Sequence, residues 1–189
     1  MPVTRRFAPR RAVLAGLAAT ALPRGAAAED KLAALIGLVG ERLAQMRAVA
    51  ESKWNTGAPV EDVAREERLV ADVAARAHAY GLAPGLAAAF FRAQIEAAKC
   101  VESALIAQWA AVHAGPFAAA ADVQSVIRPQ LDRLTPALLA ALAGAVPDVK
   151  RGDSERIASA SALADPVMAV AMARALQPLL ALAGARAAP

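Results

Sequence analysis

After Glu29, apolar residues recur every three or four positions along almost the whole chain. This spacing places them on one face of an α-helix. A strand would need apolar and polar residues in alternation within a run of β-branched side chains, and the sequence contains no such run. The 189 residues, 58% of them apolar, suffice for one domain with a single core. The sequence therefore predicts an all-α fold, a single-domain bundle of about six helices.

Proline, glycine and aspartate mark the expected helix ends. Gly81 should close the second helix in the left-handed conformation, and Asp165 should cap the last helix, with Pro166 in its first turn and a kink at Pro178. Arg128 precedes a proline, so we expect it to be non-helical and to project its side chain from the entry to the fourth helix. The predicted helices are 30–52 or slightly longer, 60–80 or 61–80, 84–113, 129–144, and two shorter ones after residue 147.

The first 28 residues differ in composition from the rest of the chain. They contain five arginines and no acidic residue, then an apolar run from Ala12 to Leu22, and they end in three alanines. A run of about eleven residues is too short for a spanning helix, which needs roughly 20. We therefore expect residues 1–28 to be a cleavable export signal and residues 29–189 to be the mature domain.

The arginine pairs in this segment bear on the export route. Arg10 and Arg11 precede the apolar run and are typical of the twin-arginine route, with Arg5 and Arg6 as a second candidate pair. The predicted location is periplasmic or secreted, with no membrane association once the signal is removed.

Charge and residue usage exclude several classes of function. Five of the 21 basic residues lie in the signal, so 16 remain against 17 acidic residues, a net charge of about −1 that argues against a nucleic-acid or anionic-membrane partner. Cys100 is the only cysteine, so no internal disulfide can form. His78 and His113 have no cysteine or acid at ligand spacing, and no phosphate-binding glycine loop is present. We expect no metal and no cofactor.

Charged residues interrupt two apolar stripes. On the first helix, Arg42 and Lys53 lie on the core face, roughly 16 Å apart along the axis. On the third helix, Glu102 lies in the middle of the core face. A lone buried charge is costly, so each of these could be a structural ion pair or could extend to solvent. The two stripes consist of Leu35, Val39, Arg42, Met46, Val49 and Lys53, and of Phe91, Ile95, Ala98, Glu102, Leu105 and Trp109.

Further charges gather where the second and fourth helices begin. Asp62, Arg65 and Glu66 share one helical turn, where acids commonly complement the helix dipole. Arg128 adds another cation at the start of the fourth helix. Several cations and an acid that converge inside a bundle indicate a small anionic ligand, and we infer a dicarboxylate.

Several segments together resemble the all-helical chorismate mutases, and specifically their exported subclass. The resemblance covers most of residues 30–140. It implies an isomerase of the shikimate pathway and aromatic amino acid biosynthesis, which converts chorismate to prephenate by an intramolecular Claisen rearrangement. No cofactor or covalent intermediate is then needed, and the enzyme is expected to be a homodimer with one pocket in each chain. The matching segments are ERL at 41–43, KWNTGAPVEDVARE at 53–66, YGLAP at 80–84, FFRAQIEAAKCVE at 90–102 and IRPQLDRL at 127–134.

The resemblance also implies roles for catalytic residues. Arg42, Arg65 and Arg128 match the arginines around the two substrate carboxylates. Lys53 matches a lysine that reaches a carboxylate and the ether oxygen. Glu102 falls where relatives place Gln or Glu beside that oxygen, and a glutamate there helps only while it is protonated.

Three more positions match substrate-binding residues. Asp62 and Glu66 correspond to positions near the ring hydroxyl. Ala98 departs from the family, because relatives often carry Ser or Thr there in contact with a carboxylate. Loss of one hydrogen bond to a charged group costs about 1.5–3 kcal/mol, unless a water replaces the hydroxyl.

Two alternatives remain at this stage. An isochorismate-pyruvate lyase on the same fold would use a similar cationic pocket, although Glu66 and Glu102 favour the mutase. A non-catalytic exported helical binding protein would instead close Arg42, Lys53 and Glu102 into an internal ion network.

Overall fold

The structure is a computed structural model that describes residues 30–149 and 153–185; the expected export signal lies outside these ranges. Within them the chain forms α-helices, one short 3₁₀-helix (η1) and one short π-helix (η2), and no strand. The prediction of an all-α bundle is confirmed. The elements are α1 (Lys31–Ala44), α2 (Met46–Thr56), α3 (Val63–Arg76), η1 (Ala77–Tyr80), α4 (Pro84–Ala111), η2 (Val123–Ile127), α5 (Arg128–Val149), α6 (Ser154–Ser159) and α7 (Pro166–Gly184).

The first predicted helix corresponds to α1 and α2, which follow each other with only Gln45 between them. Gln45 keeps a right-handed helical conformation, with φ −70° and ψ −18°. The Asp30 side chain caps α1 by accepting from the Ala33 amide at 3.1 Å. Gly57 ends α2 at φ 68°, a left-handed conformation that favours glycine. The two successive helices carry both cations of the first stripe.

Helix α3 begins at Val63, two or three residues later than the sequence predicted. The Asp62 side chain accepts from the Arg65 amide at 3.2 Å and so fixes the cap at this position. At the other end, η1 carries the chain to Tyr80, and Gly81 closes it at φ 72°, as predicted.

The expectation that Arg128 is non-helical is wrong. Arg128 has φ −57° and ψ −46° and is the first residue of α5, because η2 leads directly into this helix. The predicted end near Gly144 is also wrong, since α5 continues to Val149 with Pro147 inside it. Ala145 and Val149 are fully buried, so packing of this last part offsets the hydrogen bond that Pro147 cannot donate.

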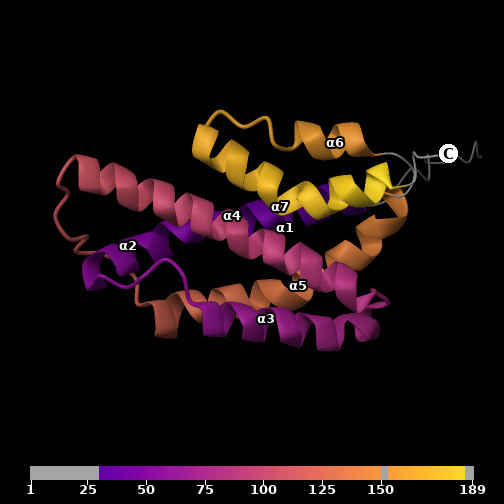
Figure 1. Cartoon of the computed structure of the whole chain (residues 1–189), viewed down its shortest axis with the longest axis horizontal. Coiled ribbons are helices and arrows are strands. Elements are labelled where there is room, and N and C mark those ends of the chain that lie inside the picture. Colours follow the sequence, from indigo (N-terminus) through magenta and orange to yellow (C-terminus); the bar gives the residue numbers. More distant parts are fainter. Residues whose placement is uncertain (1–29, 150–152, 186–189) are drawn as a thin grey trace, which may run out of the picture.

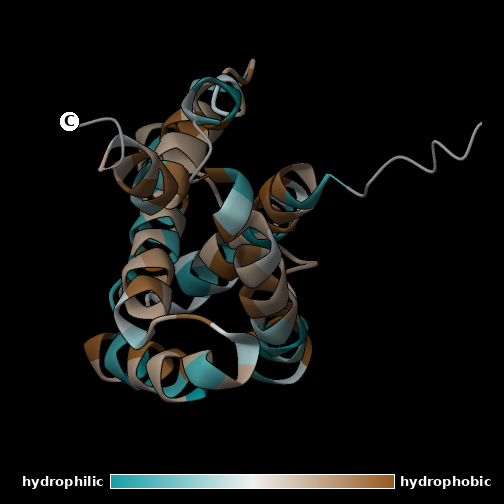
Figure 2. Ribbon diagram, turned by 90° about the vertical axis from the view of Figure 1, so that its right-hand side faces the viewer, coloured by the Kyte–Doolittle hydropathy of each residue, from teal (hydrophilic) through white to brown (hydrophobic). Residues whose placement is uncertain are grey.

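Helix α4, the longest, runs through the middle of the molecule, with α3 and α5 on one side and α6 and α7 on the other (Figure 1). It packs against α7, α3 and α2, while α1 packs against α5. Phe90 and Phe91 of α4 are fully buried and meet edge to face, with ring centroids 5.7 Å apart. Hydrophobic and hydrophilic residues are interspersed along each helix, as expected for amphipathic helices (Figure 2).

Helix α7 is long and apolar enough to cross a membrane by length and composition. In this fold it contributes Ala171, Leu176 and Leu179 to the core, all fully buried. Asp165 caps it and Pro166 occupies its first turn, as predicted. Pro178 lies inside the helix, and the kink expected there stays a prediction.

Candidate active site

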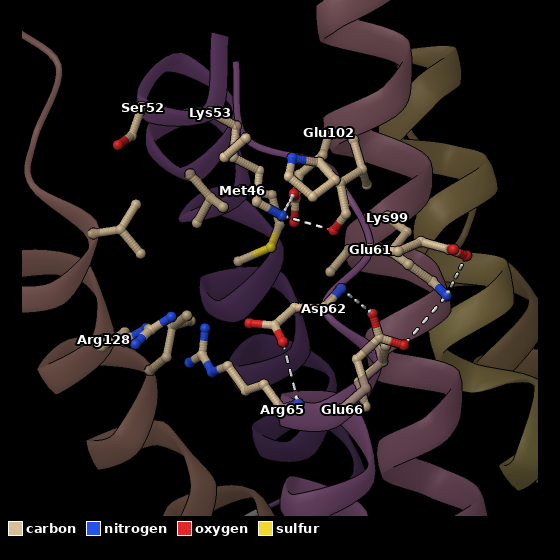
Figure 3. A pocket seen from close by; sticks show the side chains of 18 of the residues that line it. Met46, Ser52, Lys53, Glu61, Asp62, Arg65, Glu66, Lys99, Glu102 and Arg128 are labelled. Carbon is tan, nitrogen blue, oxygen red and sulfur yellow. Dashed lines mark hydrogen bonds and ion pairs between the residues drawn. The ribbon is translucent and has the colours of Figure 1, made fainter. Parts of the chain in front are cut away.

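A cavity of about 490 Å³ lies between α2, α3, α4 and the junction of η2 with α5. This volume is within the range of small-molecule sites. Every residue that the sequence nominated for the site lines this cavity: Arg42, Lys53, Asp62, Arg65, Glu66, Ala98, Glu102 and Arg128. Figure 3 labels six of them, all except Arg42 and Ala98.

Three arginines from different helices form one wall of the cavity. Arg65 and Arg128 extend toward each other (Figure 3), and Arg42 is only 6% exposed. Among the described residues, no side chain or backbone group forms a hydrogen bond or ion pair with the guanidinium of Arg42 or Arg65. Arg128 donates to the Gln124 side chain. Within the described chain these two guanidinium groups therefore lack a hydrogen-bonded or ion-paired partner, and the charges of Asp132 and Glu102 act on them only through space.

Burial and mutual repulsion disfavour these charges. Desolvation, followed by the charge of Arg65, lowers the pKa of Arg42 to about 10. Desolvation and the charge of Arg128 also lower the pKa of Arg65. Both groups remain cationic at neutral pH, so the wall holds a positive potential that an anion can relieve.

The opposite wall contains an ion pair between α2 and α4. Lys53 Nζ lies 2.6 Å from Glu102 Oε2, and the side chains are 17% and 6% exposed. Lys53 also donates to the Val60 carbonyl oxygen at 2.7 Å. An ammonium has three N–H donors, so one remains for a molecule in the cavity. Burial raises the pKa of Glu102, and the hydrogen bond from Lys53 opposes this rise.

The acidic part of the lining is built on the start of α3. Glu66 Oε1 accepts from the Asp62 amide at 3.1 Å, and Asp62 in turn caps the helix. Glu66 Oε2 lies 3.4 Å from Lys99 Nζ. Ala98 follows Ile95 and precedes Lys99 among the lining residues of α4, and it contributes only a methyl group. The remaining apolar lining consists of Met46, Val49, Ala58, Pro59, Val60, Leu69, Ile95, Val123 and Leu131.

Asn55, near the end of α2, forms hydrogen bonds with the segment that precedes η2, which contains Gly115 and Phe117. Its side chain donates to the Phe117 carbonyl and accepts from the Phe117 amide, both at 2.8 Å. Trp54 donates to the Gly115 carbonyl at 3.3 Å, and Trp109 packs between Trp54 and Phe117, with centroid distances of 6.1 and 4.6 Å. We call these contacts the Asn55 clasp. The fastened segment leads into η2 and Arg128.

Sequence reasoning missed six polar residues of the lining: Ser52, Thr56, Glu61, Lys99, Asp122 and Gln124. The sequence does contain a pattern that includes Lys99, because Glu96, Lys99 and Glu102 recur at intervals of three on one helix and can form ion pairs. No sequence pattern pointed to Gln124, since it lies on a π-helix that apolar periodicity does not predict. The described residues contain no group of three or more His, Cys, Asp or Glu side chains that could hold a metal ion.

Comparison with known proteins gives the family. The model of the family "Chorismate mutase type II" matches residues 33–103. A secreted chorismate mutase of Mycolicibacterium smegmatis is 32% identical over 162 residues, which cover 82% of this chain and 89% of the relative. That relative agrees with the prediction that this chain is exported.

Solved structures agree with the sequence comparison. The crystal structure of chorismate mutase from Burkholderia thailandensis has a TM-score of 0.74 and 37% identity, covering 80% of this chain and 99% of that one. The enzyme from Burkholderia phymatum has a TM-score of 0.74 and 32% identity, covering 79% and 96%. With the fold, the cavity and these relatives in agreement, the chain belongs to the type II chorismate mutases.

Proposed function

We propose that the cavity binds chorismate and converts it to prephenate, with catalysis by positioning and by electrostatic stabilisation. The observation that carries this proposal is the buried Arg42, whose guanidinium has no hydrogen-bonded partner among the described residues and lies close enough to Arg65 for the two charges to repel each other. Two cations that the protein leaves without partners are suited to a ligand with two carboxylates. The non-catalytic alternative is a closed network of Arg42, Lys53 and Glu102. Lys53 pairs with Glu102, but Arg42 is outside that pair, which favours a ligand for its charge.

Each side chain has a part in the rearrangement. Arg42, Arg65 and Arg128 hold the substrate carboxylates and so fold the enolpyruvyl ether over the ring. As the C–O bond breaks and the C–C bond forms, negative charge grows on the ether oxygen. The remaining Lys53 donor and the acid form of Glu102 stabilise it.

Asp62 and Glu66 complete the proposed site on the side of the ring hydroxyl. Because Ala98 has no hydroxyl, it adds no hydrogen bond to a substrate carboxylate. The arginines therefore carry that carboxylate in this chain.

The test uses purified residues 29–189 and follows chorismate loss and prephenate formation. Arg42→Ala should abolish turnover, because it removes the buried cation. Arg47→Ala is the matched control on the same helical segment, since Arg47 has a 63% exposed side chain and pairs only with Glu51 among the described residues. Equal activity of both variants would refute the assignment. Incubation with isochorismate tests the lyase, whose products are salicylate and pyruvate.

We also propose that residues 1–28 are cleaved after Ala28 on export, by the twin-arginine route. The arginine pairs and the terminal alanines of this segment support the proposal. N-terminal sequencing of the exported protein should begin at Glu29. Replacement of Arg10 and Arg11 by lysine should retain the precursor inside the cell.

A homodimer is proposed for the mature protein, on the basis of its resemblance to exported relatives. A groove between α4 and α7 offers apolar surface that includes Leu86, Val170 and Leu182. Light scattering should give twice the chain mass. Val170→Asp should shift the mass toward the monomer if this groove is the interface.

A further inference from the structure

Lys99 lies on α4 between Ala98 and Glu102 and lines the cavity, but its ammonium group is turned toward carboxylates. Its Nζ lies 2.7 Å from Glu96 Oε1, 3.4 Å from Glu66 Oε2 and 3.5 Å from Glu61 Oε1. Figure 3 shows the links to Glu61 and Glu66. Of these three carboxylates, Glu66 accepts a hydrogen bond from the ammonium, and Glu61 and Glu96 form ion pairs with it. The charge of Lys99 is therefore matched by carboxylates of the protein.

Glu66 connects this ion cluster to the substrate side of the cavity. One of its oxygens faces Lys99, and the other accepts from the Asp62 amide at 3.1 Å. The Asp62 side chain accepts from the Arg65 amide. A continuous series of contacts thus runs from Lys99 through Glu66 to the cap of α3, which carries both Asp62 and Arg65 into the cavity.

The cluster differs from an ordinary surface ion pair, which contributes little to stability. The Lys99 side chain is only 18% exposed, and its partners come from three segments: the loop before α3, α3 itself and α4. The pair between Arg47 and Glu51, by contrast, joins two residues of one helix. Lys99 thus joins the start of α3 to α4 across the edge of the cavity.

We propose that Lys99 is a positioning residue for the mutase reaction, acting through Glu66 to hold the start of α3, and with it Asp62 and Arg65, against the substrate. The proposal rests on the function proposed above. Small displacements of substrate-positioning groups can change rates by about 100-fold, so a contact at one remove can affect turnover.

The test measures kcat and KM for Lys99→Met, Lys99→Arg and Arg47→Met, with the melting temperature of each. Lys99→Met should lower kcat/KM by roughly tenfold, in the range seen when groups that orient a site residue are removed. Lys99→Arg keeps the charge and should retain most of the activity. Arg47→Met removes a cation outside the cavity and should leave kcat/KM unchanged. If Lys99→Met does not fold, Lys99→Gln replaces it.

A double variant separates action through Glu66 from direct contact. Glu66→Met removes both carboxylate oxygens and should lower activity, and adding Lys99→Met should cause no further loss, because the contact is already broken. Multiplied losses would show that Lys99 acts on the substrate directly and would overturn the proposal. So would a lower melting temperature at unchanged kcat/KM, which is the signature of a purely structural pair. Failure of the proposed function is distinct, because wild type and Arg47→Met would then both be inactive.

Discussion

At the residue scale, the buried charge of Arg42 lowers the stability of the free protein but is needed for the proposed reaction. Its pKa of about 10 lies well below that of an ordinary arginine, because burial and the charge of Arg65 disfavour the charged form in the folded protein. Replacement by a methionine removes that charge and keeps most of the buried volume. We expect Arg42→Met to abolish prephenate formation while it raises the melting temperature by at least about 2 °C.

Differential scanning calorimetry without ligand checks the Arg42→Met prediction. Arg47→Met is the control, because the charge that it removes is largely in solvent, and its melting temperature should match wild type. A melting temperature of Arg42→Met below that of wild type would mean that the guanidinium is stabilised in the free protein. Its role as a cation held ready for substrate would then be untenable.

Glu102 gives a prediction for pH. Burial raises its pKa above the ordinary 4.5. The acid form is the one that can donate to the ether oxygen, so kcat/KM should fall as pH rises through that raised pKa. Glutamine donates at every pH, so Glu102→Gln should flatten this limb of the profile between pH 4 and 8. A limb that persists in Glu102→Gln would assign the titration to another group.

The same shift has a consequence for stability. A carboxyl group with a raised pKa binds more protons in the folded state than in the unfolded state. Its contribution to the free energy of unfolding therefore falls as pH rises through the interval between 4.5 and the raised value. Both kcat/KM and this contribution to the free energy of unfolding should therefore fall as pH rises.

At the element scale, the Asn55 clasp holds the approach to η2. Asn55→Ala removes both hydrogen bonds to Phe117 and should lower the free energy of unfolding by about 1–2 kcal/mol, since each is worth roughly 0.5–1.5 kcal/mol. Asn55→Asp still accepts from the amide but cannot donate to the carbonyl, so it should fall between alanine and wild type. Urea unfolding measures both, and equal stability of all three proteins would show that the clasp carries no energy.

The elements also show what the sequence could and could not predict. Two charges on apolar stripes, Lys53 and Glu102, were predicted to face the interior, and they meet there at 2.6 Å. Helical periodicity suffices for this, because it fixes which residues share a face. The extension of α5 past Pro147 was missed, because burial of Ala145 and Val149 is a tertiary effect that outweighs a local helix-breaking signal.

The missed lining residue Lys99 makes a related point. Its sequence context, between acids at intervals of three, is that of a solvated helix face. Only the docking of α3 beside α4 turns that face into the edge of a cavity. The roles of the site residues came from the family resemblance, and apolar spacing alone left open a structural ion network.

At the scale of the whole molecule, the described lining of the cavity contains as many acidic as cationic side chains, but not every cation in it pairs with an acid. Its described lining holds five cations and five acids, so the formal charge cancels. Glu102 pairs with Lys53, and Glu61 and Glu66 pair with Lys99. Asp62 and Asp122 cap α3 and η2. In the described chain, no ion pair of this kind reaches the guanidinium of Arg42 or Arg65. The result is a lining without net formal charge that contains one local cationic wall, which favours a dianion of defined orientation over anions in general.

This arrangement predicts that ligand binding stabilises the entire fold. A stable dicarboxylate shaped like chorismate, but without the breakable ether bond, should add about 2.7 kcal/mol at 100 times its Kd. For a domain of this size that corresponds to roughly 5–10 °C in melting temperature. The monocarboxylate analogue should give a much smaller shift in melting temperature. The Arg42→Ala variant should show no shift with the dicarboxylate, because the buried cation is absent. Thermal melts across a ligand titration measure this shift. No shift at saturating dicarboxylate would mean that groups of the protein itself compensate the arginine charges and that the cavity is not an anion site.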